Sequence, residues 1–185
     1  MVTKTSAPRL RSLALLLAYP GEESNEGLQA LGEREPWLSP ALNELRHTPL
    51  DVWQAEHTRL FLNGYPKTVA PPFESAYRYG QMDGNAAIEL ERLYRRAGLG
   101  TQGAPADYLG TQLEFAAWLV ENGDPELLLP LLWHEHLAAW LPRFCSDLAE
   151  GAELRLYRLL ARQLERLMPF SENEDHDPSL DTAAS

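Results

Sequence analysis

Metal binding is the first chemistry that the sequence suggests, at the tripeptide His134-Glu135-His136. The surrounding pattern is helical, and on a helix two residues that are two positions apart point about 200° away from each other. Histidine pairs that bind zinc from a helix use spacings of three or four, and no third clustered ligand follows here. We therefore interpret one histidine as packed and the other as exposed, and we predict no metal site.

Nucleophilic catalysis has a single thiol candidate, because Cys145 is the only cysteine of the chain. A lone cysteine in a leucine-rich segment is usually a small core residue. The sequence also lacks a nucleophile elbow, a phosphate-binding glycine loop and a dinucleotide fingerprint. These patterns predict no catalytic residue and no cofactor. One cysteine also excludes a disulfide within the chain and favours a reducing compartment.

Peptide binding is the chemistry that remains, and residues 67–80 are its candidate. They contain Pro71, Pro72 and several aromatic side chains. The segment is too rich in proline for a helix interior and too irregular for a strand, so we predict a long ordered loop. Aromatic side chains and prolines beside a hydrophobic helix suit an apolar groove for a peptide. A tightly packed structural loop is the alternative interpretation.

The elements that position this loop are predicted to be helices. The chain has 34 leucines against 4 valines and 1 isoleucine. Leucine favours helices, whereas branching at Cβ stiffens a side chain against the preceding helical turn. The composition therefore predicts an all-α fold, and 185 residues suit one domain.

Charge limits the class of partner. The formal net charge is −11, and residues 171–185 contribute five acidic and no basic side chains to it. We predict an acidic, disordered tail over 171–185, after a helical domain over 1–170. Because phosphate contacts need clustered lysine and arginine, this chain is expected to bind no nucleic acid. An acidic surface attracts a basic peptide instead.

Apolar periodicity and helix-breaking residues define the expected elements. Glycine and proline in 98–106 predict a hinge, and the most apolar helix, over 107–122, is expected to be central and buried. Pro142 is expected to end or kink the helix that precedes it. Helices are predicted over 10–19, 26–31, 39–45, 51–62, 85–97, 107–122, 126–141 and 154–167.

The location of the protein is predicted from what the sequence lacks. No stretch approaches the roughly 20 apolar residues that a membrane-spanning helix needs. Residues 13–19 follow basic residues, as in a signal peptide, but the run is short and has no small-x-small cleavage site. We interpret it as a first helix and predict a cytoplasmic protein.

Four segments, in this order, carry a family resemblance. Residues 58–64 (TRLFLNG), 71–77 (PPFESAY), 105–115 (PADYLGTQLEF) and 136–144 (HLAAWLPRF) resemble elements of the TorD/DmsD/NarJ family of redox-enzyme maturation chaperones. The stretch 107–123 looks most like the DmsD branch. One departure is Tyr108, where the family usually has a histidine directly after the aspartate. Tyrosine keeps an aromatic ring but does not titrate near neutrality, so a family role that needs an imidazole is not carried over.

The resemblance implies a helical fold with a hinge before the Asp107 helix, and a monomer or a dimer that swaps helices across that hinge. Its members bind twin-arginine leader peptides, or the apo form of a molybdopterin-dependent oxidoreductase subunit, and the twin-arginine translocase is a further implied partner. The family's reported binding of guanine nucleotides is not carried over, because no nucleotide motif is present. A NarJ-like assembly factor for an enzyme that is not exported is the alternative within the family.

A twin-arginine leader needs carboxylates at one end of its groove and apolar side chains along the rest, because guanidinium pairs bidentately with carboxylate. We predict Glu74 and Asp107 as the acidic end, with Ser75 bonding the peptide backbone or fixing its own loop. The competing interpretations are that Asp107 caps the central helix, that Glu74 is solvated and that the leucines are plain core. The predicted apolar wall comprises Leu60, Phe61, Pro72, Phe73, Tyr77, Tyr108 and Leu113.

Two hypotheses from other classes compete with peptide binding. A helical adaptor for a folded partner predicts no affinity for an isolated leader peptide. A helical hydrolase or metal enzyme would use Glu114, His134 or His136, and it predicts bound metal or a pocket where those side chains converge.

Overall fold

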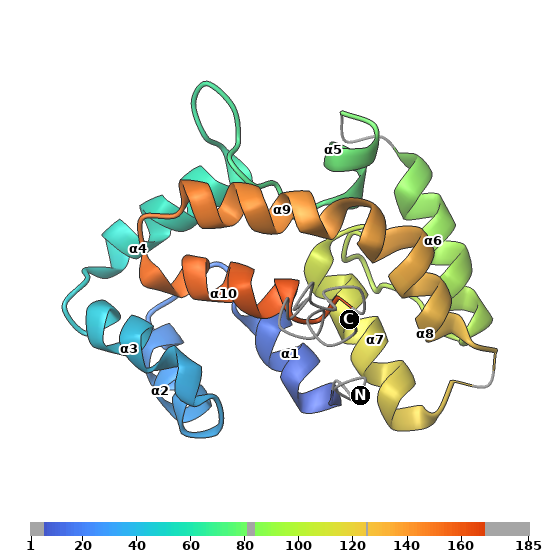
Figure 1. Cartoon of the computed structure of the whole chain (residues 1–185), viewed down its shortest axis with the longest axis horizontal. Helices are drawn as coiled ribbons and strands as arrows, with labels where there is room; N and C mark the ends of the chain where they lie inside the picture. Colours follow the sequence, from blue (N-terminus) through green and yellow to red (C-terminus); the bar gives the residue numbers. More distant parts are fainter. Residues whose placement is uncertain (1–5, 81–83, 125, 169–185) are drawn as a thin grey trace, which may run out of the picture.

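The chain folds as an array of helices around one leucine-rich core (Figure 1). The computed structural model describes residues 6–80, 84–124 and 126–168, and the predicted tail lies outside them. Within these ranges no β-strand forms, which confirms the all-α prediction. The α-helices are α1 (Ala7–Leu15), α2 (Ser24–Arg34), α3 (Ser39–Leu45), α4 (Leu50–His57), α5 (Glu74–Arg78), α6 (Gly84–Arg96), α7 (Leu109–Asn122), α8 (Leu128–Leu131), α9 (Ala138–Gly151) and α10 (Arg155–Glu165), with a 3-10 turn Pro36–Leu38 and π-helical turns Thr58–Leu62 and Leu132–Leu137.

Leucine at helical spacing forms the core. On α10, Leu156, Leu160 and Leu164 recur every four residues and are at most 1% exposed. This spacing places them on one face of the helix, which packs against α9. Helix α1 packs along α7 and also contacts α10, so α1 lies between them (Figure 1).

Most helices begin and end close to the boundaries that the helix-breaking residues predicted. The predicted helices 85–97, 107–122 and 154–167 correspond to α6, α7 and α10. The loop predicted over 67–80 is wrong in part, because it contains the helix α5. Pro71 and Pro72 precede this helix and leave its hydrogen-bond ladder intact, and the ends of the short helix are joined by an ion pair between Glu74 and Arg78.

Pro142 was predicted to end or kink the helix over 126–141, and the structure shows that it does not end it. Helices α8 and α9 run on from Leu128 to Gly151 through the π-helical turn Leu132–Leu137, and Pro142 lies inside α9. Figure 1 shows the ribbon turning between the labels α8 and α9. A proline cannot donate to the carbonyl four residues earlier, so burial of Leu141, Phe144 and Leu148 must hold the helix across this point.

A buried histidine ties α4 to the end of α1. The Nε2–H of His57 donates to the carbonyl oxygen of Leu17 at 3.0 Å, and the ring packs edge-on against Tyr19 and Phe61. Its Nδ1 atom is buried without a hydrogen-bond partner. Burial lowers the pKa of His57 below its ordinary value, although the bond to Leu17 acts in the opposite direction.

This histidine predicts acid-sensitive stability. The unfolded chain takes up a proton near pH 6.5, whereas folded His57 does so only at lower pH. The free energy of unfolding is therefore expected to fall as the pH is lowered through the window below about 6.5, and to be retained above it. Urea titrations at several pH values measure this, and His57→Gln should flatten the slope. An equal flattening by His47→Gln, which removes an exposed histidine, would contradict the assignment.

Within the described ranges, no helix is long and apolar enough to cross a bilayer.

Candidate functional site

The predicted binding loop and the predicted Asp107 helix meet directly, through main-chain and side-chain hydrogen bonds. The Oδ2 atom of Asp107 accepts from the amide of Ser75 at 3.2 Å and from its hydroxyl at 2.6 Å. The amide of Glu74 donates to the carbonyl of Asp107, and the amide of Leu109 donates to the carbonyl of Pro72. Asp107 therefore joins two segments of the chain, and we call these contacts the Asp107 clamp.

Glu74 is buried and paired inside the chain, so it is neither solvated nor open to a guest arginine in this conformation. Its side chain is 0% exposed, and Oε1 accepts from Arg78 at 2.6 Å and from Nδ1–H of His136 at 2.9 Å. A buried carboxylate is costly unless it is paired, and here two donors meet it from α5 and from the turn before α9. Glu74 thus fixes α5 against the helix that carries His136.

The other residues of the predicted wall divide by exposure. The side chains of Leu60, Phe61 and Leu113 are at most 2% exposed and belong to the core, and Pro72 is buried. Phe73 and Tyr77 are half-buried. The Phe73 ring lies 5.6 Å from the Tyr108 ring, and the Tyr77 ring packs against Trp140 at 5.5 Å between centroids. Of these two ring contacts, the one between Phe73 and Tyr108 joins the two predicted segments, whereas Tyr77 packs against α9.

Asp107 does not cap the central helix. The N-cap position of α7 is Tyr108, whose side chain makes no capping hydrogen bond, and the amide of Leu109 donates to the carbonyl of Pro72. The Tyr108 hydroxyl instead donates to the carbonyl of Leu17 at 3.3 Å, and burial raises the pKa of this phenol. Gly110 provides the room for this arrangement, because a Cβ atom there would lie 2.4 Å from the Tyr108 ring. Tyr108 thus folds back over α7 and faces α1.

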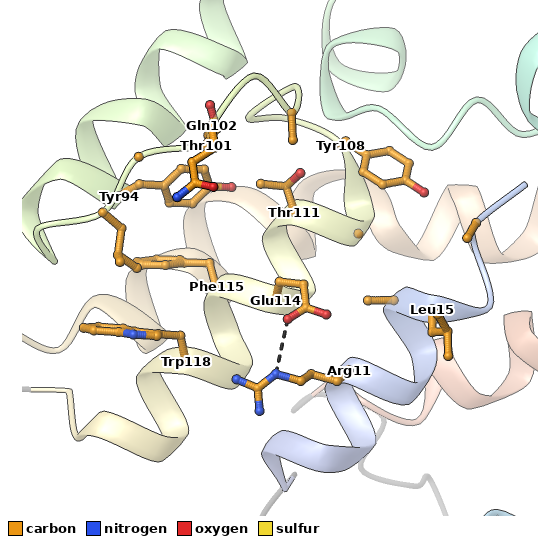
Figure 2. Close-up of a pocket in the computed structure, with 16 residues that line it drawn as sticks. Arg11, Leu15, Tyr94, Thr101, Gln102, Tyr108, Thr111, Glu114, Phe115 and Trp118 are labelled. Carbon is orange, nitrogen blue, oxygen red and sulfur yellow. Dashed lines mark hydrogen bonds and ion pairs between the residues drawn. The ribbon is translucent and has the colours of Figure 1, made fainter. Parts of the chain in front are cut away.

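An open cavity lies on the other side of Tyr108, between α1, α7 and the loop that follows α6. Its volume is about 720 Å³, and most of its lining is apolar. Figure 2 shows Tyr94, Phe115 and Trp118 on one side of it and Leu15 on the other. We call it the α1–α7 groove, which is lined by Arg11, Ala14, Leu15, Ala18, Tyr94, Leu99, Gly100, Thr101, Gln102, Ala104, Tyr108, Gly110, Thr111, Glu114, Phe115 and Trp118.

Charge is concentrated at one end of this groove, where Arg11 of α1 meets two glutamates of α7. The Nε atom of Arg11 lies 3.3 Å from Glu114, and its two terminal nitrogens bond both carboxylate oxygens of Glu121, one of them at 2.7 Å. Glu114 and Glu121 are two turns apart and therefore share one face of α7. The Arg11 guanidinium lowers the pKa of Glu121, and Glu121 in turn raises the pKa of Arg11. Figure 2 shows Arg11 reaching from α1 toward Glu114.

Among the ten predicted site residues, only Tyr108 lines the groove. The sequence carries a local signal for the rest of the α7 face, because Thr111, Glu114 and Trp118 recur at helical spacing on an otherwise apolar helix. It carries no comparable signal for Arg11 and Leu15, because their place in the groove depends on the packing of α1 against α7, far along the chain.

The histidine and cysteine residues that were considered first for metal binding and catalysis have positions that a structural role explains. His136 is buried against Glu74 whereas His134 is exposed, which confirms the interpretation of one packed and one exposed ring. Cys145 is buried in the core as predicted, and burial raises the pKa of its thiol to about 12. In the described parts of the chain, no three histidine, cysteine or acidic side chains gather as metal ligands would. Glu114 lines the α1–α7 groove, whereas His134 and His136 are not among its lining residues.

Comparison with known proteins gives the family. Residues 24–146 match the model of the nitrate reductase delta subunit family. The Tat proofreading chaperone DmsD of Salmonella typhi is 35% identical over 122 residues, which are 63% of this chain and 56% of that protein. The chaperone protein YcdY of Escherichia coli K12 is 27% identical over 109 residues, 58% of this chain and 56% of that protein. The matches thus span little more than half the length of these relatives.

A solved structure gives the same fold. A protein from Archaeoglobus fulgidus, described as a redox enzyme maturation protein, superimposes with a TM-score of 0.67 over 90% of this chain and 95% of its own, at 23% identity. The four sequence segments, the helical fold and the family match all agree. The chain therefore belongs to the nitrate reductase delta subunit family, the group that includes NarJ, TorD and DmsD.

Proposed function

We propose that this protein is a cytoplasmic chaperone that binds the twin-arginine leader peptide of a molybdopterin-dependent oxidoreductase subunit, in the α1–α7 groove. It would hold the leader, or the apo subunit that carries it, during cofactor insertion and before the subunit reaches the twin-arginine translocase. It would act by binding and not by catalysis. The relatives named as chaperones and the fold of the maturation protein support this role.

The observation that carries the proposal is the composition of the groove. Apolar and aromatic side chains line most of it, and Glu114 lies at one end with Glu121 beside it. A twin-arginine leader has the complementary order, with guanidinium groups followed by an apolar run. Apolar walls with a few polar groups at fixed positions are typical of sites that bind an extended ligand with a defined direction.

The residues predicted from the sequence enter this proposal in a different way. Tyr108 would contact the peptide directly. The Asp107 clamp and Glu74 would act indirectly, because they hold Tyr108 and the start of α7 in place. Contact of a peptide with Phe73 or Tyr77 stays a prediction, since both side chains are partly exposed outside the groove.

A NarJ-like role is the second candidate, because the matching family is described by the delta subunit of nitrate reductase. Such a helper would bind the mature N-terminus of a subunit that is not exported. The two candidates differ in the arginine pair, since only a leader peptide requires it. Titration with a leader peptide and with the mature N-terminal segment of the same subunit separates them.

Exposed apolar side chains allow a direct test of the groove. Leu15 in the groove is 59% exposed, and Ile88 on α6, outside the groove, is 45% exposed. Leu15→Gln is expected to weaken leader-peptide binding about fivefold, because it removes roughly 1 kcal/mol of apolar contact. Ile88→Gln makes a similar polar change and should leave the affinity unchanged. Calorimetric titration measures both, and equal affinities for the two variants would place the peptide elsewhere.

A further inference from the structure

Arg11 lies beside two carboxylates, of Glu114 and Glu121, that would otherwise bind a guanidinium group of a guest peptide. It extends from α1, while both of its carboxylate partners belong to α7. Its terminal nitrogens form a bidentate pair with Glu121, and its Nε faces Glu114. This fork-to-carboxylate geometry is the one by which a protein recognises an arginine of its partner.

The contact is exposed enough to be exchanged. The side chain of Arg11 is 40% exposed, and those of Glu114 and Glu121 are 53% and 43% exposed. Ion pairs in such positions contribute little to folding, because water screens them and two long side chains must be ordered. Opening this pair therefore costs little, and another guanidinium can replace Arg11 with nearly the same geometry.

We propose that Arg11 is an internal competitor for the acidic end of the groove, which a guest peptide must displace with its own arginine. This inference rests on the proposed function, and it adds a reason for selectivity. A peptide with arginine restores the bidentate pair that its entry breaks. A peptide with glutamine at that place has no guanidinium to exchange, so Arg11 keeps its pair and the two carboxylates add nothing to the binding of that peptide.

The test uses two synthetic peptides, one with two arginines followed by a short run of leucine and alanine, and one with glutamines in place of the arginines. Arg11→Gln should bind the arginine peptide about fourfold more tightly than the unchanged protein does, which is the range expected for freeing an exposed carboxylate pair. The glutamine peptide should show no gain. The affinity of Arg11→Gln for the arginine peptide should also fall more steeply with salt concentration.

Two matched variants exclude a general effect of charge. Arg96 is 47% exposed and pairs with the exposed Glu126 outside the groove, so Arg96→Gln makes the same change in net charge. It should leave the affinity for the arginine peptide unchanged. Arg11→Lys keeps the charge but loses the bidentate fork, and it should give a smaller gain than Arg11→Gln. Thermal melts of all variants check that the fold is retained.

The outcomes separate this inference from the proposed function. If the unchanged protein binds the arginine peptide and Leu15→Gln weakens binding, but Arg11→Gln gives no gain, competition by Arg11 is wrong and the groove stands. The same holds if Arg96→Gln gains as much as Arg11→Gln, or if the glutamine peptide gains equally. If no variant binds either peptide, both proposals fail.

Discussion

Replacing Asp107 with alanine is expected to lower the free energy of unfolding by about 3 kcal/mol. The buried carboxylate accepts both the amide and the hydroxyl of Ser75, and alanine removes both of these buried hydrogen bonds. Ser75→Ala removes only the hydroxyl bond and should cost about 1 kcal/mol. Urea denaturation measures both changes, and Glu91→Ala in an exposed pair serves as a control that should change little.

The variant Asp107→Asn separates this structural role from direct peptide contact. Asparagine keeps an oxygen that accepts from Ser75, so stability should fall less than in Asp107→Ala and peptide affinity should hold. If Asp107→Asn kept its stability but lost affinity for an arginine-bearing peptide, the carboxylate would act on the guest. That result would favour the interpretation from the sequence over the one from the structure.

Replacing Trp118 with alanine is expected to weaken leader-peptide binding about 30-fold, which corresponds to about 2 kcal/mol. Trp118 is half-buried on α7, and its ring forms part of the groove wall. A large, rigid aromatic side chain in such a position buries much apolar surface at a small loss of conformational entropy. Calorimetry measures the affinity without depending on tryptophan fluorescence, which the substitution itself alters.

Trp133 provides the control for this variant, because it is also half-buried but lies outside the groove. Trp133→Ala removes the same side chain and should retain peptide affinity within about twofold. Equal losses in the two variants would show that binding depends on general packing and not on the groove wall.

Much of the fold could be predicted from the sequence, because helices depend on local spacing and local breakers. Leu156, Leu160 and Leu164 specify the buried face of α10 by themselves. Pro142 was misleading, since a breaker is a local signal and the burial of Phe144 and Leu148 around it is a property of the folded chain. Helix α5 was missed for the same reason, because its clamp partner Asp107 is remote in sequence.

The site was harder to predict than the fold. The sequence identified Ser75 and Asp107 as candidate site residues, and the structure brings them together. Side-chain chemistry alone does not say whether such groups face a guest or each other. Arg11 and Leu15 were not identified as site residues, because only the packing of α1 on α7 makes them walls of a groove.

Helix α7 places one set of side chains in the core and another at the groove, and this separation has a consequence for redesign. Leu109, Leu113, Ala116 and Ala117 are fully buried, whereas Thr111 and Trp118 are half-buried and Glu114 is exposed. Thr111 and Glu114 can be exchanged with little loss of stability, because surface substitutions away from packed positions change it by about 0.5 kcal/mol or less, whereas Trp118 also packs against the core. One scaffold can thus be retargeted to a new cargo sequence by editing a single helix face, without repacking its interior.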